Sequence, residues 1–501
     1  MKNILKRTVS VLLLLAMMAA MLTASAATVK GDMNSDGTVK LTDVRAILKI
    51  ASGMKKPTSA QLSRGDMNGD GAITLSDVYA ALDVCVNVDR REHLDPITQI
   101  TPAESHGSST KYTFCMVTEY CAETFPSSPV SDTSNPLYTP LPNGTFDYVT
   151  SGPVKDYESG KSFYILKSGR RVYANEVKTF TGYKMPNARA ELRTRVDTDD
   201  TTTSFYIALD WRVPFNVKIK PQEYETGYND RKYNISNGEF TGSYMDITFQ
   251  YIKSADGTLA FPESKTIKSC KWIVNADNST ATLRIYFRNA GEFYGYHTYY
   301  NKDNYLVVTV KEPVQSLKGR TIEIDPGHGG NQPGAGSGTG VFEKDITYKI
   351  ALRLKSYLES AGATVVFSRD DGASVPEIEE RRINSMKKNA DMFISIHLDS
   401  SSDKSAKGSS VYYYTSYSGE LAEAIANNLP KSLKSNLDYT MKNRGFHFYP
   451  FRVTRIENCP AVLVECGFIS NSSDFKIQNS ASGQKYIAHG IYMGVLEYFG
   501  I

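Results

Sequence analysis

The last third of the chain alternates between short apolar runs and longer amphipathic stretches. Runs rich in Ile and Val cover residues 321–325, 364–368, 392–397 and 461–465. Between them, apolar positions recur three and four residues apart near 343–361, 377–389, 419–433 and 482–498. Strands that alternate with helices predict a C-terminal α/β domain with a mostly parallel sheet over residues 318–501.

In the middle of the chain, apolar and polar residues instead alternate with a period of two. Residues 163–166 and 171–173 flank the turn Ser168-Gly169, which predicts a hairpin. Further alternating runs, and both Trp, predict a β-rich region (sandwich or small barrels) over residues 156–315, serving as a targeting or spacer module. Its aromatic side chains either bind glycan or fill a β core, and the second use is the commoner one. Residues 93–155 are rich in Pro, Ser and Thr, which predicts an irregular linker.

Near the N-terminus, the motif DMNSDG at Asp32 recurs as DMNGDG at Asp66. Oxygen-bearing side chains at loop positions one, three, five and twelve are what Ca²⁺ requires, and glycine at position six permits the sharp turn. Amphipathic helices are predicted after the loops, at Leu41–Ala51 and at 75–86. The expected ligands of the two calcium ions are Asp32, Asn34, Asp36 and Asp43, and Asp66, Asn68, Asp70 and Asp77.

The chain before the first loop is too short for the entering helix of an ordinary EF-hand. Residues 28–92, with two loop-and-helix repeats, resemble a type I dockerin, a small all-α calcium-binding module. The resemblance implies binding to a cohesin domain of a scaffoldin or cell-surface protein. A calcium-stabilised spacer without a partner is the alternative. The residues that would contact the cohesin are Leu41, Thr42, Arg45, Leu75, Ser76 and Tyr79.

The first 27 residues have the features of a secretion signal. Lys2, Lys6 and Arg7 precede an apolar run that is short for a membrane span, and Ala24-Ser25-Ala26 provides a cleavage site. We therefore expect a secreted protein, extracellular or attached to a cell surface, with no membrane span. The whole chain has a formal charge of +3, and without the three signal cations it is neutral. Such a balance gives no reason to expect a nucleic acid partner.

Four polar residues stand at strand ends or at a helix start of the predicted α/β domain. His328 follows the first strand among glycines, His397 and Glu465 end later strands, and Glu343 begins a helix. Two histidines and one glutamate, with one open position, form the ligand set of a catalytic zinc site, and a further carboxylate can act as general base. Singly, each has a structural alternative: a hydrogen-bonded histidine, a carboxylate at a helix N-terminus, or an ion-pair partner. His447 is a poorer candidate because we expect it in a loop.

Residues 318–501 resemble the zinc-dependent N-acetylmuramoyl-L-alanine amidases of the amidase 3 family. The motifs are IDPGHGG at 324–330, EKD at 343–345, SIH at 395–397, and PAVLVE at 460–465 followed by GFISN. The resemblance implies one zinc ion bound by His328, Glu343 and His397, with Glu465 as the catalytic residue. The implied reaction is hydrolysis of the amide bond between N-acetylmuramic acid and L-alanine in peptidoglycan.

Three alternatives stay open at this point. A zinc peptidase would cut within the peptidoglycan stem peptides. A non-catalytic protein would bind the cell wall without cutting it. A role in polysaccharide degradation is suggested only by the dockerin, because the paired carboxylates of a glycosidase are not recognisable in the sequence.

Overall fold

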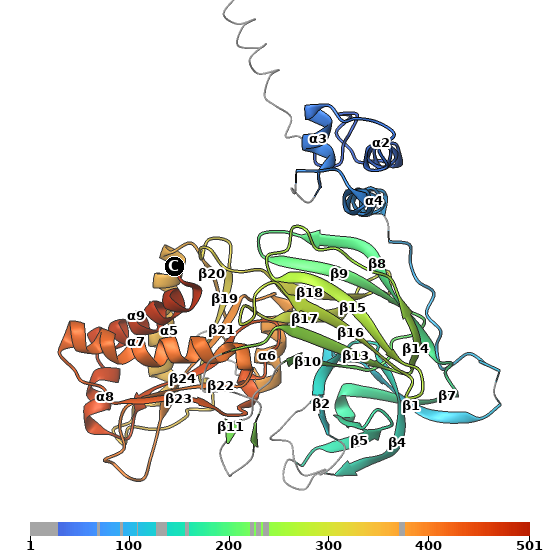
Figure 1. The fold of residues 1–501 in the computed structure, drawn as a ribbon. Helices are drawn as coiled ribbons and strands as arrows, with labels where there is room; N and C mark the ends of the chain where they lie inside the picture. Colours follow the sequence, from blue (N-terminus) through green and yellow to red (C-terminus); the bar gives the residue numbers. More distant parts are fainter. Residues whose placement is uncertain are drawn as a thin grey trace, which may run out of the picture. The chain divides into compact units, whose positions relative to one another are not determined.

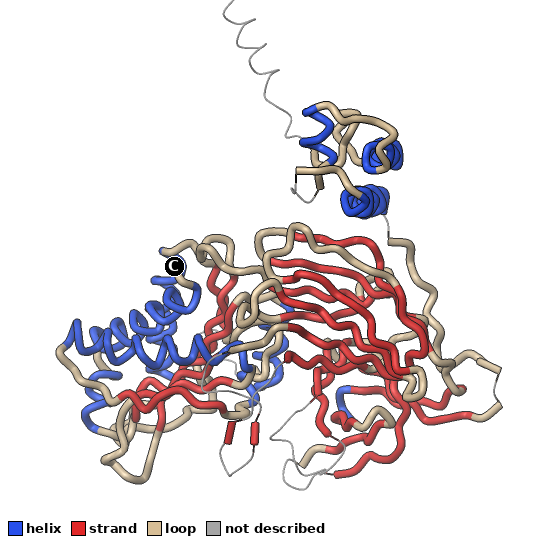
Figure 2. Tube along the Cα trace, viewed as in Figure 1, coloured by secondary structure: helices blue, strands red, loops and turns tan. Residues whose placement is uncertain are grey.

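The computed structural model describes residues 29–67, 71–90, 94–107, 109–126, 138–155, 160–220, 225–226, 232–233, 240–369 and 376–501. These form two units, which divide the chain at Asp95 and Pro96 (Figure 1). The predicted secretion signal lies outside the described residues. Figure 2 shows that strands dominate the middle of the second unit and that long helices belong to its C-terminal part. Among the described residues, no helix has the length and apolar character needed to cross a membrane.

Where it is described, the N-terminal unit contains helices only: α2 (Leu41–Ala51), α3 (Ser59–Gly65) and α4 (Leu75–Arg90). The two predicted helices are present, and α4 extends beyond its expected end. Helix α3 was not predicted. It begins at a cap, where the side chain of Thr58 accepts a hydrogen bond from the backbone N–H of Gln61. Val44, Ile47 and Val78 are buried in the small core of this unit.

A seven-stranded antiparallel sheet begins the second unit, in the order β3-β2-β6-β5-β4-β1-β7. The predicted hairpin is present as β5 and β6. The expectation of an irregular linker over 93–155 was wrong, because four strands lie there. Its prolines are compatible with strands, since Pro126 and Pro142 end theirs and Pro140 lies on the edge strand β3. The strands are β1 (Lys111–Val117), β2 (Cys121–Pro126), β3 (Tyr138–Pro142), β4 (Phe146–Lys155), β5 (Ser162–Leu166), β6 (Arg170–Tyr173) and β7 (Val177–Tyr183), with the 3-10 turn η1 (Ala174–Glu176) before β7.

Two further sheets pack face to face as a sandwich, with strand orders β10-β13-β16-β15 and β14-β8-β9-β18-β17. Alternate residues of both sheets, such as Ile207 and Ile247, share one buried core, as the period of two predicts. Trp211 is also buried there, which agrees with a packing role for the aromatics. The strands are β8 (Ala188–Thr198), β9 (Thr202–Leu209), β10 (Phe215–Lys220), β13 (Tyr244–Gln250), β14 (Ile252–Asp256), β15 (Ile267–Asn275), β16 (Thr280–Phe287), β17 (Tyr296–Tyr300) and β18 (Leu306–Lys311); β11 (Glu225–Thr226) pairs with β12 (Lys232–Tyr233).

The C-terminal part is an α/β domain with a six-stranded mixed sheet in the order β20-β19-β21-β24-β22-β23. Its first four strands are parallel, whereas β22 runs antiparallel to β24. The strands are β19 (Thr321–Pro326), β20 (Thr364–Phe367), β21 (Met392–Asp399), β22 (Ser409–Tyr413), β23 (Asn443–Phe448) and β24 (Ala461–Phe468). The helices are α5 (Glu343–Ser360), α6 (Ile378–Lys387), α7 (Gly419–Leu437), α8 (Ser472–Gln478) and α9 (Ala481–Phe499), with short turns η3 (Ser416–Ser418) and η4 (Arg452–Thr454).

Different layers cover the two faces of this sheet. One face packs with α5, α7 and α9 in a large apolar core that includes Ile324, Ile394 and Val464. The other face is covered by α6 and the segment around η4, in a smaller cluster that includes Phe393 and Ile456. Figure 1 shows α6 between this sheet and the strands of the middle region.

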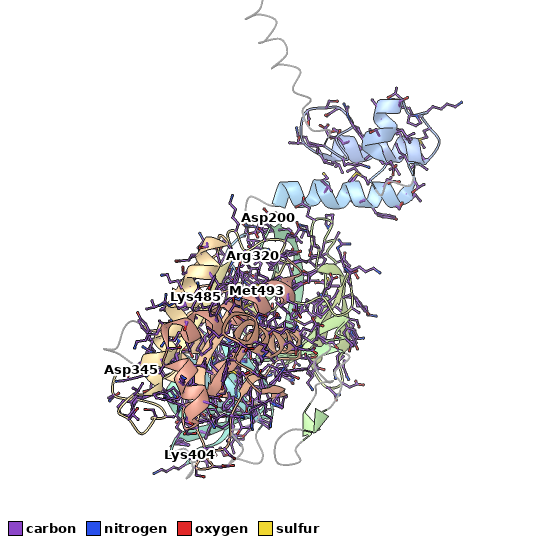
Figure 3. The ribbon with its side chains drawn as sticks, turned by 90° about the vertical axis from the view of Figure 1, so that its left-hand side faces the viewer. Asp200, Arg320, Asp345, Lys404, Lys485 and Met493 are labelled. Atoms are coloured by element: carbon purple, nitrogen blue, oxygen red, sulfur yellow. The ribbon has the colours of Figure 1, made fainter. Side chains whose placement is uncertain are left out.

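The middle region and the α/β domain are joined by buried contacts. The ring of Tyr417 enters the core of the sandwich, with its centre 5.1 Å from that of Phe293. Arg320 Nη2 donates a hydrogen bond to the carbonyl of Asp200 at 2.8 Å, and the two residues lie side by side in Figure 3. Cys115 and Cys121 are both buried and form no disulfide with each other.

Candidate metal centre and active site

His328, Glu343 and His397 are brought together at the carboxyl ends of the parallel strands. One ligand atom from each lies within 4.8 Å of the others, and no other cluster of this kind occurs in the part of the chain that the structure describes. Glu343 Oε2 is 3.1 Å from His328 Nε2, and Glu343 Oε1 is 2.9 Å from His397 Nδ1. Residues from β19, α5 and β21 therefore converge on one point, as the sequence predicts.

The backbone around this cluster is shaped to let the three side chains meet. His328 has a φ of 60°, a left-handed conformation that is uncommon for residues other than glycine. A Cβ on Gly334 would lie 2.5 Å from His328 Cδ2 and 2.6 Å from Glu343 Oε2, so any larger residue would displace a ligand. The N–H groups of Ala335 and Leu398 donate hydrogen bonds to Glu343 at 2.9 and 3.0 Å and fix its carboxylate.

The protonation of Glu343 suits cation binding. Burial alone would raise its pKa, but hydrogen bonds from His328 and His397 outweigh that effect and lower the pKa well below its usual value. An ionised carboxylate and two imidazole nitrogens are the donor set of a catalytic zinc site, which leaves a fourth position for water or substrate. The residues present therefore fit Zn²⁺.

Glu465 lies across from the cluster, because it pairs in register with His397 between β24 and β21. Its Oε2 atom is buried and has no hydrogen-bond partner in the structure. Burial raises the pKa of Glu465 well above its usual value, and the carboxylates of Glu343 and Asp399 raise it further. A divalent cation between the three ligands would act in the opposite direction. An unpartnered carboxylate beside an open metal position is the arrangement expected of a general base.

Other polar groups, whose role was not predicted from the sequence, support the backbone and side chains around the cluster. Asp325 is buried and accepts hydrogen bonds from Ser395 Oγ at 2.6 Å and from Ser368 Oγ. Arg381 Nη1 lies 2.5 Å from Asp325 Oδ1, and its Nη2 donates to the carbonyl of His328 at 3.2 Å. Burial would raise the pKa of Asp325, but Arg381 and these hydroxyls hold it below its usual value.

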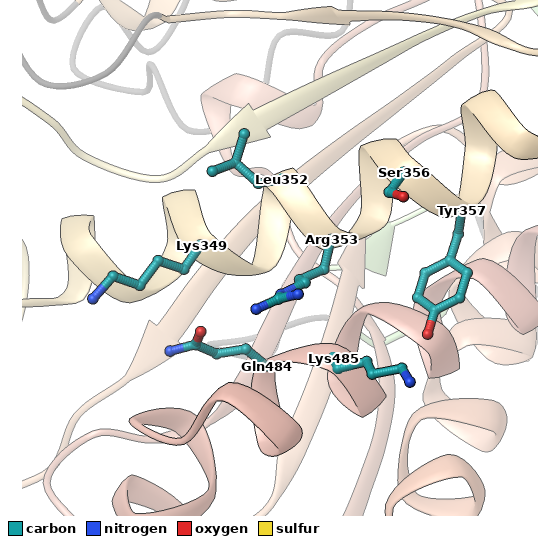
Figure 4. Close-up of a pocket in the computed structure, with 7 residues that line it drawn as sticks. All are labelled: Lys349, Leu352, Arg353, Ser356, Tyr357, Gln484 and Lys485. Atoms are coloured by element: carbon teal, nitrogen blue, oxygen red, sulfur yellow. The ribbon is translucent and has the colours of Figure 1, made fainter.

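His447 does not join the cluster. It lies on the strand β23 rather than in a loop, so that expectation was wrong, and its side chain is exposed. The run Asn443–Phe448 was missed because it is short and mostly polar. A groove of about 650 Å³ between α5 and α9 also lies apart from the cluster (Figure 4). None of its lining residues is a metal ligand type; they are Lys349, Leu352, Arg353, Ser356, Tyr357, Gln484 and Lys485.

In the N-terminal unit, the described part of the first loop has the expected arrangement of acidic residues. Asp32 and Asp43 are buried and accept hydrogen bonds from loop N–H groups, among them those of Gly37 at 2.8 Å and Met33 at 2.9 Å. Asp36 stays at the surface. Asp66 and Asp77 are also buried, but Asn68 and Asp70 lie outside the described residues, so the second site is seen only in part.

Two parts of the chain match known protein families. Residues 322–497 match the family described as N-acetylmuramoyl-L-alanine amidase, and residues 30–80 match the type I dockerin domain. The uncharacterised protein YqiI of Bacillus subtilis is 35% identical over 188 residues, which cover 38% of this chain and 89% of YqiI. The probable cell wall amidase LytH of Staphylococcus aureus is 33% identical over 231 residues, which cover 46% of this chain and 72% of LytH. The chain belongs to the N-acetylmuramoyl-L-alanine amidase family.

Solved structures of amidases also match the C-terminal domain. The catalytic domain of CwlV, an N-acetylmuramoyl-L-alanine amidase from Bacillus (Paenibacillus) polymyxa, is 29% identical and has a TM-score of 0.34. The match covers 36% of this chain and 99% of the solved catalytic domain. The amidase AmiC2 of Nostoc punctiforme is 34% identical, with the same TM-score and a coverage of 36% and 98%.

Proposed function

We propose that this amidase is a secreted peptidoglycan hydrolase that cleaves the bond between N-acetylmuramic acid and L-alanine and is tethered through its dockerin to a cohesin. His328, Glu343 and His397 would hold one zinc ion, and Glu465 would act as general base. The observation that carries the proposal is the convergence of the three ligand atoms within 4.8 Å, with Glu465 in register beside His397. The family membership supplies the bond that is cut.

The residues of the site divide the hydrolysis between them. When bound, zinc supplies a Lewis acid that polarises the amide carbonyl and makes water more acidic. Glu465 accepts a proton from the attacking water as the new C–O bond forms. It then returns the proton to the nitrogen of L-alanine as the C–N bond breaks. The products are a glycan strand that keeps its lactyl carboxylate and a stem peptide with a free N-terminal L-alanine.

Digestion of purified peptidoglycan tests this function. The metal-free protein and the zinc-loaded protein are each incubated with peptidoglycan, and the released ends are identified by mass spectrometry. We expect new amino termini on L-alanine only, and only with zinc. New amino termini on other residues would indicate a peptidase, release at a sugar–sugar bond would indicate a glycosidase, and binding without release would indicate a non-catalytic wall protein.

The proposal for the dockerin rests on its surface. All six residues expected to contact a cohesin are exposed, and three of them are large and apolar: Leu41, Leu75 and Tyr79 are 52%, 56% and 66% exposed. Burying such side chains against a partner is favourable. We expect the chain to bind at least one of a panel of type I cohesin domains in calcium but not in a calcium chelator. Retention by none of them in calcium would contradict the tether.

A further inference from the structure

Residues 81–321 lie between the two family matches and have no role assigned by them. Their described part consists mainly of the strands β1 to β18, which we call the β module (residues 111–311). The β module contacts the α/β domain in several places, and one of them is at α6, where Lys161 lies 3.8 Å from Glu379. The same helix also touches the loop that carries His328. This helix therefore links the module to the candidate active site.

Two consecutive arginines of α6 face in different directions, since neighbouring residues on a helix are about 100° apart. Arg381 faces the sheet, where it contacts Asp325 and donates to the carbonyls of Pro326 at 3.3 Å and His328 at 3.2 Å. It thus holds the loop that carries one expected zinc ligand. Because His328 has an unfavourable left-handed conformation, this loop needs contacts that keep it in place.

Arg382 is buried as well. Burial would lower its pKa, but the carboxylates of Glu123, Glu457 and Glu176 contribute to a net rise. Two of these three, Glu123 and Glu176, belong to the β module. Of these two, Glu123 is the one held ionised, because the neighbouring arginines lower its pKa, whereas burial raises the pKa of Glu176 to about 8.

Glu123 of β2 is the centre of this contact. Its Oε1 atom accepts a hydrogen bond from Arg455 Nη1 at 3.1 Å, and both side chains are 4% exposed. Its Oε2 atom lies 3.5 Å from Arg452 Nη2, and Arg452 also pairs with Glu379 on α6. Lys161 of the module lies 3.8 Å from the same Glu379. Charges from both parts are therefore interleaved around α6.

Such a cluster tolerates little displacement. Buried charges are costly unless each keeps its partner, and moving the β module away would remove Glu123 from Arg452 and Arg455. The position of α6 is consequently tied to that of the module. Arg381, on the other side of the same helix, is tied to it as well.

We propose that the β module is a brace for the zinc site: through Glu123 and Arg452 it clamps Glu379 of α6, and this helix holds Arg381 against the His328 loop. In this arrangement Glu123, Arg382 and Arg381 are positioning residues that touch neither zinc nor substrate. The inference rests on the zinc site of the proposed function. It predicts that a change in the β module alters zinc binding in a separate part of the fold.

The test compares two buried glutamates of the second unit in the full-length protein. Glu123→Gln removes the charge that pairs with Arg452 and Arg455, and Arg452 in turn pairs with Glu379 of α6. Glu312→Gln is the matched control, because Glu312 is also buried and accepts hydrogen bonds from Thr203, Ser264 and the backbone of Lys265 and Thr266, all within the β module. Zinc affinity is measured by competition with a chelator. Hydrogen exchange is measured at the amides of Gly327 and Gly329, which are bonded to Ile396 and Gln332.

We expect Glu123→Gln to weaken zinc binding about 10-fold and to speed hydrogen exchange at both amides. A loss of this size is usual when residues that orient the ligands of a metal site are replaced. Glu312→Gln is expected to leave both unchanged. Arg381→Lys, which removes the Nη2 donor that reaches the carbonyl of His328, should weaken zinc binding at least as much. If Glu123→Gln does not fold, Glu379→Gln replaces it, since Glu379 is only partly buried and pairs with Arg452 and Lys161.

The outcomes distinguish a failure of the inferred brace from a failure of the proposed function. If the wild-type protein binds zinc and Glu123→Gln, or its replacement, binds it equally well with unchanged exchange, the β module is only a spacer and the inference is wrong. If the wild-type protein binds no zinc, the proposed function fails and the brace fails with it. Equal weakening by Glu123→Gln and Glu312→Gln would show a general loss of stability and would also overturn the brace.

Discussion

The two faces of the α/β sheet are built from alternate residues of the same strands, yet they serve different purposes. On the face covered by α5, α7 and α9, strand residues such as Ile322, Ile394 and Val462 are apolar and fully buried. On the other face, the carboxyl-terminal positions of the strands carry Asp325, Ser395, His397 and Glu465. Because successive side chains of a strand point to opposite faces of the sheet, the hydrophobic core and the candidate active site lie on opposite faces.

The difference shows how the fold can support a polar site without losing its core. The helix-covered face is a continuous apolar layer that stabilises the domain. Among the described residues, α6, the η4 segment and the β module cover the polar face, and its charges depend on specific partners. We therefore expect changes on the first face to affect stability, and changes on the second to affect zinc binding and catalysis.

The largest expected effect belongs to the polar face. Glu465→Gln keeps the size of the side chain but removes the proton acceptor, so hydrolysis of peptidoglycan should fall about 10² to 10⁴-fold. Activity is measured as the release of N-terminal L-alanine. Zinc binding, measured with a competing chelator, should persist, because Glu465 is not one of the three converging ligands. Normal turnover by this variant would remove Glu465 from the role of base.

A core substitution on the opposite face should have the reverse profile. Ile394 is fully buried in the helix-covered core, and Ile394→Ala leaves a cavity that costs about 2–5 kcal/mol of unfolding free energy. Urea denaturation measures this loss. Activity per folded molecule and zinc affinity should stay within about twofold of wild type, since the side chain points away from the site. A selective loss of zinc affinity would show that the two faces are not independent.

The next residue gives the matched comparison. Ser395 faces the polar side, and Ser395→Ala removes the hydrogen bond of 2.6 Å to Asp325. A hydrogen bond to a charged group contributes about 1.5–3 kcal/mol, and a smaller share is lost here because Asp325 keeps Arg381 and Ser368. We expect a modest loss of stability with a measurable fall in zinc affinity. A stability loss as large as that of Ile394→Ala, with zinc affinity intact, would contradict the division.

The helix-covered face was the part that the sequence could predict. Parallel strands buried on both sides form continuous apolar runs, and the four predicted strands and four predicted helices of this domain are found with small changes at their ends. Strands β22 and β23 were missed because they are short and mixed in composition. The strands over 111–155 were missed because prolines dominate that stretch, although an edge strand tolerates them.

The sequence could indicate the residues that converge at the candidate site but not the residues that support them. His328, Glu343, His397 and Glu465 stand at strand or helix ends, where side chains of chemical use are recognisable by type. Arg381 gave no such signal, since its partner Asp325 is 56 residues away and an arginine on an amphipathic helix is ordinarily exposed. Only the tertiary fold reveals that it is buried and turned toward the metal-binding loop.

The last expected effect concerns a carboxyl group on the polar face that no contact neutralises well. Glu323 is fully buried in the middle of β19, and the nearest described cation, Lys388 Nζ, is 3.8 Å from its Oε1 atom. Burial raises the pKa of Glu323 from 4.5 to about 7, with Asp325 adding to the rise and Lys388 opposing it. The folded protein therefore holds a proton that the unfolded chain releases.

This pKa sets the direction of a pH effect. Because the folded state binds the proton more tightly, the contribution of Glu323 to stability is full below pH 4.5 and is lost as the pH rises through about 7. Glu323→Gln removes the titration, so its melting temperature relative to wild type should be higher at pH 8 than at pH 5. Lys388→Met should move the loss to higher pH, since it removes the cation that favours ionisation. A constant difference between Glu323→Gln and wild type at both pH values would mean that Glu323 is ionised in the fold, and the polar face would then accommodate an uncompensated buried charge.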